Sequence, residues 1–89
     1  GYTILKYSSG QKFGNHVDDH PTFKNPRRVS LVYYANEDFS GGKIIFDKFG
    51  IEYQPKENEA IIFPSSFMYS HTVEPVTDGI RYAVVTWLN

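Results

Sequence analysis

The sequence has no cysteine, no long hydrophobic run and no excess of charge of either sign. The absence of cysteine excludes a disulfide scaffold, a thiolate zinc site and a cysteine nucleophile, and it favours a cytoplasmic location. No apolar run approaches the ~18 residues of a transmembrane helix, and the first residues are unlike a signal peptide. Nine basic against ten acidic residues, a net charge of −1, argue against a surface built for nucleic acid or anionic lipid.

Aromatic residues, in contrast, are abundant. Seven Phe, seven Tyr and one Trp among 89 residues indicate a packed core rather than a disordered chain. A chain of this length is expected to form one domain. Because a strand-like pattern starts at once, at Tyr2, we expect residues 1–89 to be a single core domain cut from something longer.

Short runs of β-branched and aromatic residues alternate with turns rich in Gly, Pro, Asn and Ser, and no segment keeps a 3.6-residue apolar period. This pattern predicts an all-β fold with little or no helix. About eight short strands at this spacing are typical of a sandwich or jelly roll. They are expected at residues 2–7, 12–19, 28–36, 43–47, 51–54, 60–63, 71–74 and 80–88. Residues 22–27 are expected to form a loop at the mouth of a cavity.

His16 and Asp18 are separated by one residue in a predicted strand, so both side chains are expected on the same face. A histidine and a carboxylate placed this way form half of a metal site. With a second histidine they leave about three positions open on an octahedral ion, as in non-haem Fe(II) oxygenases. That histidine is either His20, on the same strand, or His71, on another. His71 is favoured because three residues along one strand lie in a line, whereas a facial set of ligands needs three corners.

Arg81 is the next residue of interest. A turn at residues 75–79 would place Arg81 and His71 on one face of a hairpin. An inward-facing arginine beside a metal ligand needs an anion, because an uncompensated buried guanidinium is costly and a carboxylate fits its planar fork. The alternative is a structural ion pair with an acid such as Glu74 or Asp78.

Several short motifs resemble those of one enzyme family. In chain order they are Tyr7-x-x-Gly10-x-x-Phe13-x-x-His16-x-Asp18, Arg28-x-x-x-x-Tyr33-Tyr34-x-Asn36, Gly41-Gly42, Phe63-Pro64-Ser65, His71-x-Val73-x-Pro75-Val76 and Gly79-x-Arg81-Tyr82, followed by Trp87. The set resembles the Fe(II)- and 2-oxoglutarate-dependent dioxygenases, most closely the prolyl 4-hydroxylases. Many collagen-type members of that group have lysine at the position of Arg81, so the oxygen-sensing and microbial branches are more similar.

The resemblance implies a fold and a set of ligands. The fold would be a double-stranded β-helix, or jelly roll, without the N-terminal supporting helices that are usual in the family. His16, Asp18 and His71 would hold Fe(II), while Arg81 and Tyr33 would bind the distal carboxylate of 2-oxoglutarate. The other implied co-substrate is O₂, and ascorbate is a further candidate cofactor.

The resemblance also assigns roles to two aromatic residues. Tyr7 would be a catalytic residue facing the iron and the co-substrate, and Trp87 would line the pocket. Tyr33 and Trp87 could equally be ordinary core residues. The expected reaction is hydroxylation of a prolyl residue in a peptide or protein, with succinate and CO₂ as co-products. The alternatives are another protein residue, a small molecule or a nucleobase as substrate, or a non-catalytic jelly-roll module that binds metal.

Overall fold

The computed structural model describes residues 2–19 and 26–89, which form ten strands and a single 3₁₀ turn, η1 (Phe67–Tyr69). The strands are β1 (Tyr2–Tyr7), β2 (Phe13–His16), β3 (Val29–Tyr34), β4 (Ser40–Gly41), β5 (Ile44–Phe46), β6 (Ile51–Tyr53), β7 (Ala60–Pro64), β8 (His71–Val73), β9 (Val76–Asp78) and β10 (Arg81–Leu88). The prediction of an all-β fold is therefore confirmed. None of the described helical segments is long and apolar enough to cross a membrane.

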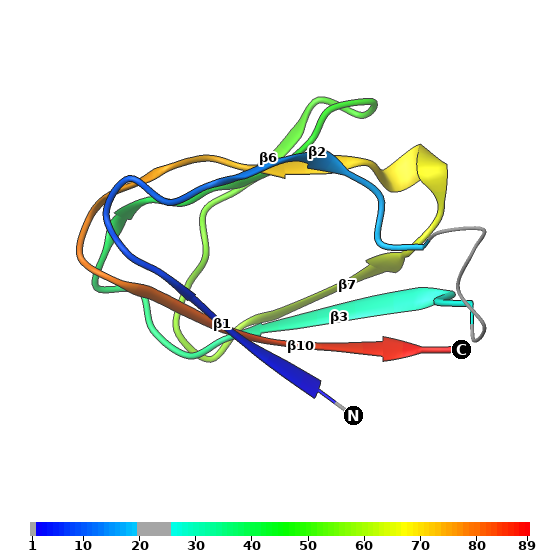
Figure 1. The fold of residues 1–89 in the computed structure, drawn as a ribbon, viewed down its shortest axis with the longest axis horizontal. Helices are drawn as coiled ribbons and strands as arrows, with labels where there is room; N and C mark the ends of the chain where they lie inside the picture. The colour runs from blue at the N-terminus through cyan, green and yellow to red at the C-terminus, as the bar shows by residue number, and fades with distance from the viewer. Residues whose placement is uncertain (1, 20–25) are drawn as a thin grey trace.

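The strands form two four-stranded sheets, in the orders β1-β10-β3-β7 and β2-β8-β5-β6, and a small sheet of β4 and β9. The two larger sheets face each other as layers (Figure 1). Every strand pair is antiparallel, and the chain passes repeatedly from one large sheet to the other. Facing antiparallel sheets that exchange successive strands in this way form a jelly roll, as predicted.

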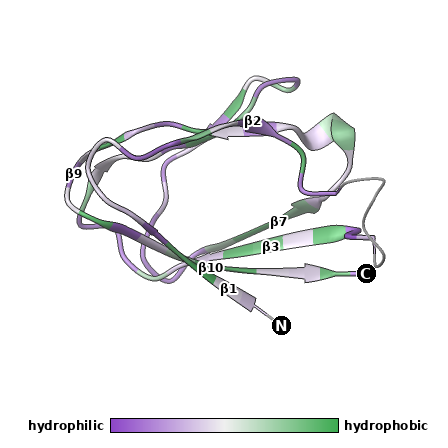
Figure 2. Ribbon diagram, viewed as in Figure 1, coloured by the Kyte–Doolittle hydropathy of each residue, from purple (hydrophilic) through white to green (hydrophobic). Residues whose placement is uncertain are grey.

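Alternation along the strands sends one set of side chains between the sheets. In β3 the inward residues are Ser30, Val32 and Tyr34, all buried. The main apolar cluster consists of Val32, Tyr34, Ile44, Phe46, Phe63, Ala83 and Val85, drawn from both large sheets. Figure 2 shows hydrophobic segments along β3 and β7. Burial of these side chains, worth about 1.5–3 kcal/mol for each large one, holds the two layers together.

Two details of the fold differ from the sequence-based expectation. The strand predicted at residues 12–19 ends at His16, and Asp18 lies in a bend beyond it. The predicted hairpin between His71 and Arg81 is wrong, because the segment between them is not a turn: it contains the strand β9. Instead β9 pairs with β4, so β8 joins one large sheet and β10 the other. His20 and most of the predicted loop at 22–27 lie outside the described residues.

We predict that Gly41→Ala lowers the free energy of unfolding by about 3 kcal/mol. Gly41 has φ +76°, and a Cβ there would lie 2.3 Å from the backbone oxygen of Pro75, where β4 meets β9. Gly50→Ala is the matched control, because Gly50 has φ +64° and open space around it. Its free energy of unfolding should fall by only ~1 kcal/mol, the cost of placing an alanine in the left-handed region. Urea unfolding followed by circular dichroism measures both, and equal losses would contradict the clash at Gly41.

Candidate active site

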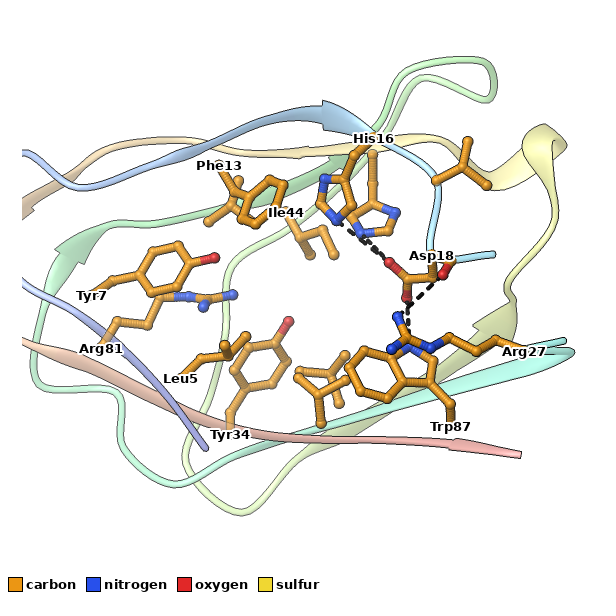
Figure 3. Close-up of a pocket in the computed structure, with 15 residues that line it drawn as sticks. Leu5, Tyr7, Phe13, His16, Asp18, Arg27, Tyr34, Ile44, Arg81 and Trp87 are labelled. Carbon is orange, nitrogen blue, oxygen red and sulfur yellow. Dashed lines mark hydrogen bonds and ion pairs between the residues drawn. The ribbon is translucent and has the colours of Figure 1, made fainter. Parts of the chain in front are cut away.

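A pocket of about 600 Å³ lies between the two large sheets. It is lined by residues of β1, β2, β3, β5, β8 and β10 and by the segments beside β2 and β3. Figure 3 shows His16 and Asp18 at one end of this pocket, Tyr7 and Arg81 at the other, and Tyr34 between them. The two ends therefore carry different chemistry.

Two histidines face each other across neighbouring strands at the first end. His16, the last residue of β2, pairs with His71, the first residue of β8. The Nδ1 of His16 lies 2.9 Å from the carbonyl oxygen of Gly14, and that of His71 lies 3.0 Å from the carbonyl oxygen of Tyr69. A carbonyl can only accept, so each Nδ1 donates its proton to the backbone. In the neutral imidazole each Nε2 then carries the lone pair, which is the form of histidine that binds metals. In the protonated imidazole the same Nε2 donates to Asp18 instead.

Asp18 completes this group. Its Oδ1 lies 3.4 Å from Nε2 of His16 and 3.3 Å from Nε2 of His71. One candidate ligand atom from each of the three residues lies within 4.8 Å of the other two. Two imidazole nitrogens and one carboxylate oxygen form the donor set of the non-haem Fe(II) oxygenases, and this set leaves positions open. The residues present therefore fit such an ion.

The electrostatics of the triad keep its carboxylate ionised. Burial opposes ionisation of Asp18, but hydrogen bonds with His16, His71 and Ser30 outweigh it and hold the pKa of the carboxyl well below its usual range. Burial likewise disfavours the charged form of His16, whereas its bonds to Asp18 and to the Gly14 carbonyl raise the pKa of the imidazole. An ionised carboxylate is the form that a cation requires.

Backbone and side-chain contacts, rather than strand pairing, position Asp18. The backbone N–H of Asp19 donates to the carbonyl of Ser65 at 3.1 Å, and the backbone N–H of Arg27 donates to Oδ1 of Asp19 at 3.0 Å. Nη1 of Arg27 also donates to the carbonyl of Asp18 at 3.3 Å, while its guanidinium stacks 3.8 Å above the ring of Trp87. The bend at Asp18 is therefore held by contacts with Ser65 and Arg27, although it belongs to no strand.

Arg81 occupies the other end of the pocket and is only 2% exposed. Its guanidinium carbon lies 4.9 Å from the centre of the Tyr7 ring and 5.1 Å from that of Tyr34, within range of cation–π attraction. Among the described residues no carboxylate forms an ion pair with it, so the alternative pairing with Glu74 or Asp78 is not observed. The positive charge is buried without an acid.

Unused hydrogen-bonding groups accompany that charge. Within the described chain, Nε of Arg81 and the hydroxyl of Tyr34 are buried without a hydrogen-bond partner. Burial raises the pKa of Tyr34 to about 12, against the opposing effect of Arg81, so the hydroxyl keeps its proton as a donor. Burial also raises the pKa of Tyr7, again opposed by Arg81. Two donors and a cation that lack an acceptor fit a carboxylate.

The structure corrects the residue expected beside Arg81. Tyr33 was predicted to bind the co-substrate, but it points to the outer face of the sheet, is 36% exposed and donates to Oδ1 of Asn58. Its neighbour Tyr34 lines the pocket instead. Alternation explains the shift, because the inward residues of β3 are the even-numbered ones, from Ser30 to Tyr34.

Trp87 lines the pocket, as expected, and its indole N–H donates to Oδ2 of Asp18 at 3.2 Å. Tyr7 also lines the pocket, but it lies beside Arg81 at the end opposite His16 and Asp18, so the expected position facing the metal ligands is not observed. Sequence reasoning missed three residues that contact the site: Ser30, Arg27 and Tyr34. Tyr34 could have been found from the alternation of β3, because it lies two residues after Val32, an obvious core residue, and so on the same inward face. Nothing in the sequence pattern marks Ser30 or Arg27.

Comparison with known proteins decides the family. The sequence model of the 2OG-Fe(II) oxygenase superfamily matches residues 2–89. The chain belongs to this superfamily. A PKHD-type hydroxylase from Synechococcus sp. (strain JA-2-3B'a(2-13)) is 34% identical over 93 residues, covering 96% of this chain and 41% of that relative. Another from Psychrobacter sp. (strain PRwf-1) is 37% identical, covering 92% and 35%. The chain thus spans less than half the length of these curated relatives.

Solved structures agree with this oxygenase assignment. A prolyl 4-hydroxylase from Phytophthora capsici superposes with a TM-score of 0.83 at 26% identity, covering 99% of this chain and 31% of that one. A Pseudomonas putida prolyl-4-hydroxylase has a TM-score of 0.77 at 24% identity, covering 99% and 50%, and shows the fold alone. The resemblance to prolyl 4-hydroxylases drawn from the sequence is confirmed.

We predict that Arg81→Met leaves the free energy of unfolding of the ligand-free oxygenase unchanged or raises it by up to about 2 kcal/mol. The reason is that the substitution removes a buried charge that is paired with no acid among residues 2–19 and 26–89. Arg27→Met is the matched control and should lower that free energy by about 1 kcal/mol, because Arg27 donates to Asp18 and stacks on Trp87. Urea unfolding followed by circular dichroism compares the two. A large loss for Arg81→Met would indicate a structural role.

Proposed function

We propose that this chain forms the catalytic core of an Fe(II)- and 2-oxoglutarate-dependent dioxygenase that hydroxylates a prolyl residue in a peptide or protein. One observation carries the proposal. A His-Asp-His donor set shares its pocket with Arg81, a buried cation that forms no ion pair within the described part of the chain. A structural metal site has no use for such a cation, so the arrangement argues against a non-catalytic metal-binding module.

His16, Asp18 and His71 would hold the iron, through one Nε2 from each histidine and a carboxylate oxygen. The chemistry that Fe(II) supplies when bound is the coupling of 2-oxoglutarate decarboxylation, which uses O₂, to hydroxylation of a substrate C–H bond. The protein's share of the work is to fix the donor atoms, to keep Asp18 ionised and to leave coordination positions open.

Arg81 and Tyr34 would hold the carboxylate of 2-oxoglutarate that lies away from the metal. The Arg81 guanidinium supplies charge and parallel N–H donors, and the Tyr34 hydroxyl supplies one more. Tyr7 packs against Arg81 and helps to fix the guanidinium. Between the two ends the pocket is walled by apolar side chains such as Val32 and Val85, which keep water from competing for these bonds.

The prolyl substrate is supported by the relatives. Several similar structures are prolyl hydroxylases, and one from Trichoplax adhaerens is described in complex with a peptide fragment of a hypoxia-inducible factor. The curated relatives are named only as PKHD-type hydroxylases. Hydroxylation of another protein residue or of a small molecule uses the same iron and co-substrate residues, so the substrate has to be tested separately from the chemistry.

We predict that the full-length protein, supplied with Fe(II), 2-oxoglutarate and proline-containing peptides, releases succinate and adds one oxygen atom to proline. Succinate assay and mass spectrometry of a peptide library measure the two results. Asp18→Ala and His71→Ala should abolish both, since each removes a predicted ligand. Succinate release with oxygen on another residue would overturn the prolyl substrate alone, whereas no turnover with any substrate would overturn the enzymatic function.

We predict that Tyr34→Phe weakens 2-oxoglutarate binding about tenfold, the usual worth of one hydrogen bond to a charged group. Tyr33→Phe is an adjacent control that removes a hydroxyl from the same strand but from its outer face, and it should leave the affinity unchanged. Titration of the metal-loaded protein with 2-oxoglutarate provides the dissociation constants. The reverse result would restore Tyr33 as the co-substrate residue.

A further inference from the structure

The two oxygens of Asp18 have different surroundings. Oδ1 faces Nε2 of both His16 and His71. Oδ2 is turned the other way, where it accepts a hydrogen bond from Ser30 Oγ at 2.6 Å and from Trp87 Nε1 at 3.2 Å. One oxygen of the carboxylate is thus occupied by the protein, and only the other is directed towards the histidines.

The donor to Oδ2 belongs to a buried chain of hydroxyls. Ser30 Oγ lies 2.8 Å from Ser65 Oγ, and the two serines are 0% and 1% exposed. A hydroxyl carries one proton, and an ionised carboxylate can only accept, so the proton of Ser30 points at Asp18. Ser65 must then donate to Ser30. The chain has one direction, from Ser65 through Ser30 to Asp18, and hydrogen bonds in such a chain strengthen one another.

The fold holds this relay, the hydrogen-bonded hydroxyls of Ser65 and Ser30, in place. Ser30 lies opposite Phe63 in the pairing of β3 with β7 and opposite Trp87 in the pairing with β10. The backbone N–H of Ser65 donates to Arg28, and its carbonyl accepts from Asp19, next to the carboxylate. Ser30 therefore belongs to one large sheet and Ser65 directly follows β7 of that sheet, while the histidines belong to the other sheet.

We propose that Ser30 and Ser65 are positioning residues for the metal centre. The relay holds Oδ2 of Asp18 away from the histidine pair, so that the carboxylate binds the metal through Oδ1 alone. A carboxylate free to rotate could offer both oxygens, which would fill one of the positions that 2-oxoglutarate and O₂ need. This inference rests on the proposed function, because it assigns a role towards the same ion.

The test is Co(II) binding by the full-length protein, with the visible absorption spectrum as a second readout that depends on coordination number and geometry. Ser30→Ala should weaken Co(II) binding about tenfold and change the spectrum, the usual result of losing an outer partner of a ligand. Ser65→Ala should act in the same direction but less. Ser70→Ala removes another buried serine hydroxyl, one that contacts Lys48 and not Asp18, and should change neither readout.

A double variant separates positioning from folding. Ser30→Ala leaves the buried Ser65 hydroxyl without its acceptor and should lower Tm. The double variant Ser30→Ala/Ser65→Ala also removes the Ser65 hydroxyl that lost its acceptor, so Tm should recover in part. Co(II) affinity should stay at the level of Ser30→Ala. Recovery of both together would overturn the positioning role, as would wild-type affinity and spectrum in Ser30→Ala. Failure of the wild-type protein to bind Co(II) would overturn the proposed function instead.

Discussion

The carboxylate of Asp18 connects the two sheets, and the rest of the site depends on this connection. Through Oδ1 it meets the histidines of β2 and β8, and through Oδ2 it accepts bonds from the β3 and β10 side, from Ser30 and Trp87. A residue in a bend, outside any ladder, would otherwise be free to swing. Contacts from both layers fix its rotamer before any ion arrives, which lowers the entropy that metal binding has to overcome.

The opposite end of the pocket follows a different principle. At the Asp18 end the carboxylate has both histidines as partners, whereas Arg81 is buried among aromatic rings and forms no ion pair with any described residue. Such a residue lowers the stability of the free protein, and the cost of burying its charge is offset only when an anion binds. A chain this small has little stability to spare. Arg81 is therefore better explained by binding than by folding, and its place at the end of the pocket opposite the triad suits a ligand with two polar ends.

The sequence predicted the layers and most strands, because alternation and turn residues are local signals. The family resemblance predicted that His16, Asp18, His71 and Arg81 share one pocket. Prediction failed where the result depends on pairing between distant segments. The pairing of β9 with β4 replaced the expected hairpin, and Arg81 reached the pocket from the sheet opposite His71. Tyr33 was chosen over Tyr34 because a motif does not report which of two adjacent tyrosines faces inward. Ser30 and Ser65 are ordinary serines until the fold brings them to Asp18.

The Gly41-Gly42 pair shows how one local signal can serve two purposes. From sequence it predicts a turn, and Gly41 does allow β4 to approach β9 closely. Gly42, however, lies next to Arg81: a Cβ there would come within 2.9 Å of Cδ of Arg81 and 3.2 Å of Cγ2 of Val76. The missing side chain leaves the room that the arginine stem needs to enter the pocket from the start of β10. Gly42, directly after β4, therefore leaves space for Arg81 at the end of the pocket opposite Asp18.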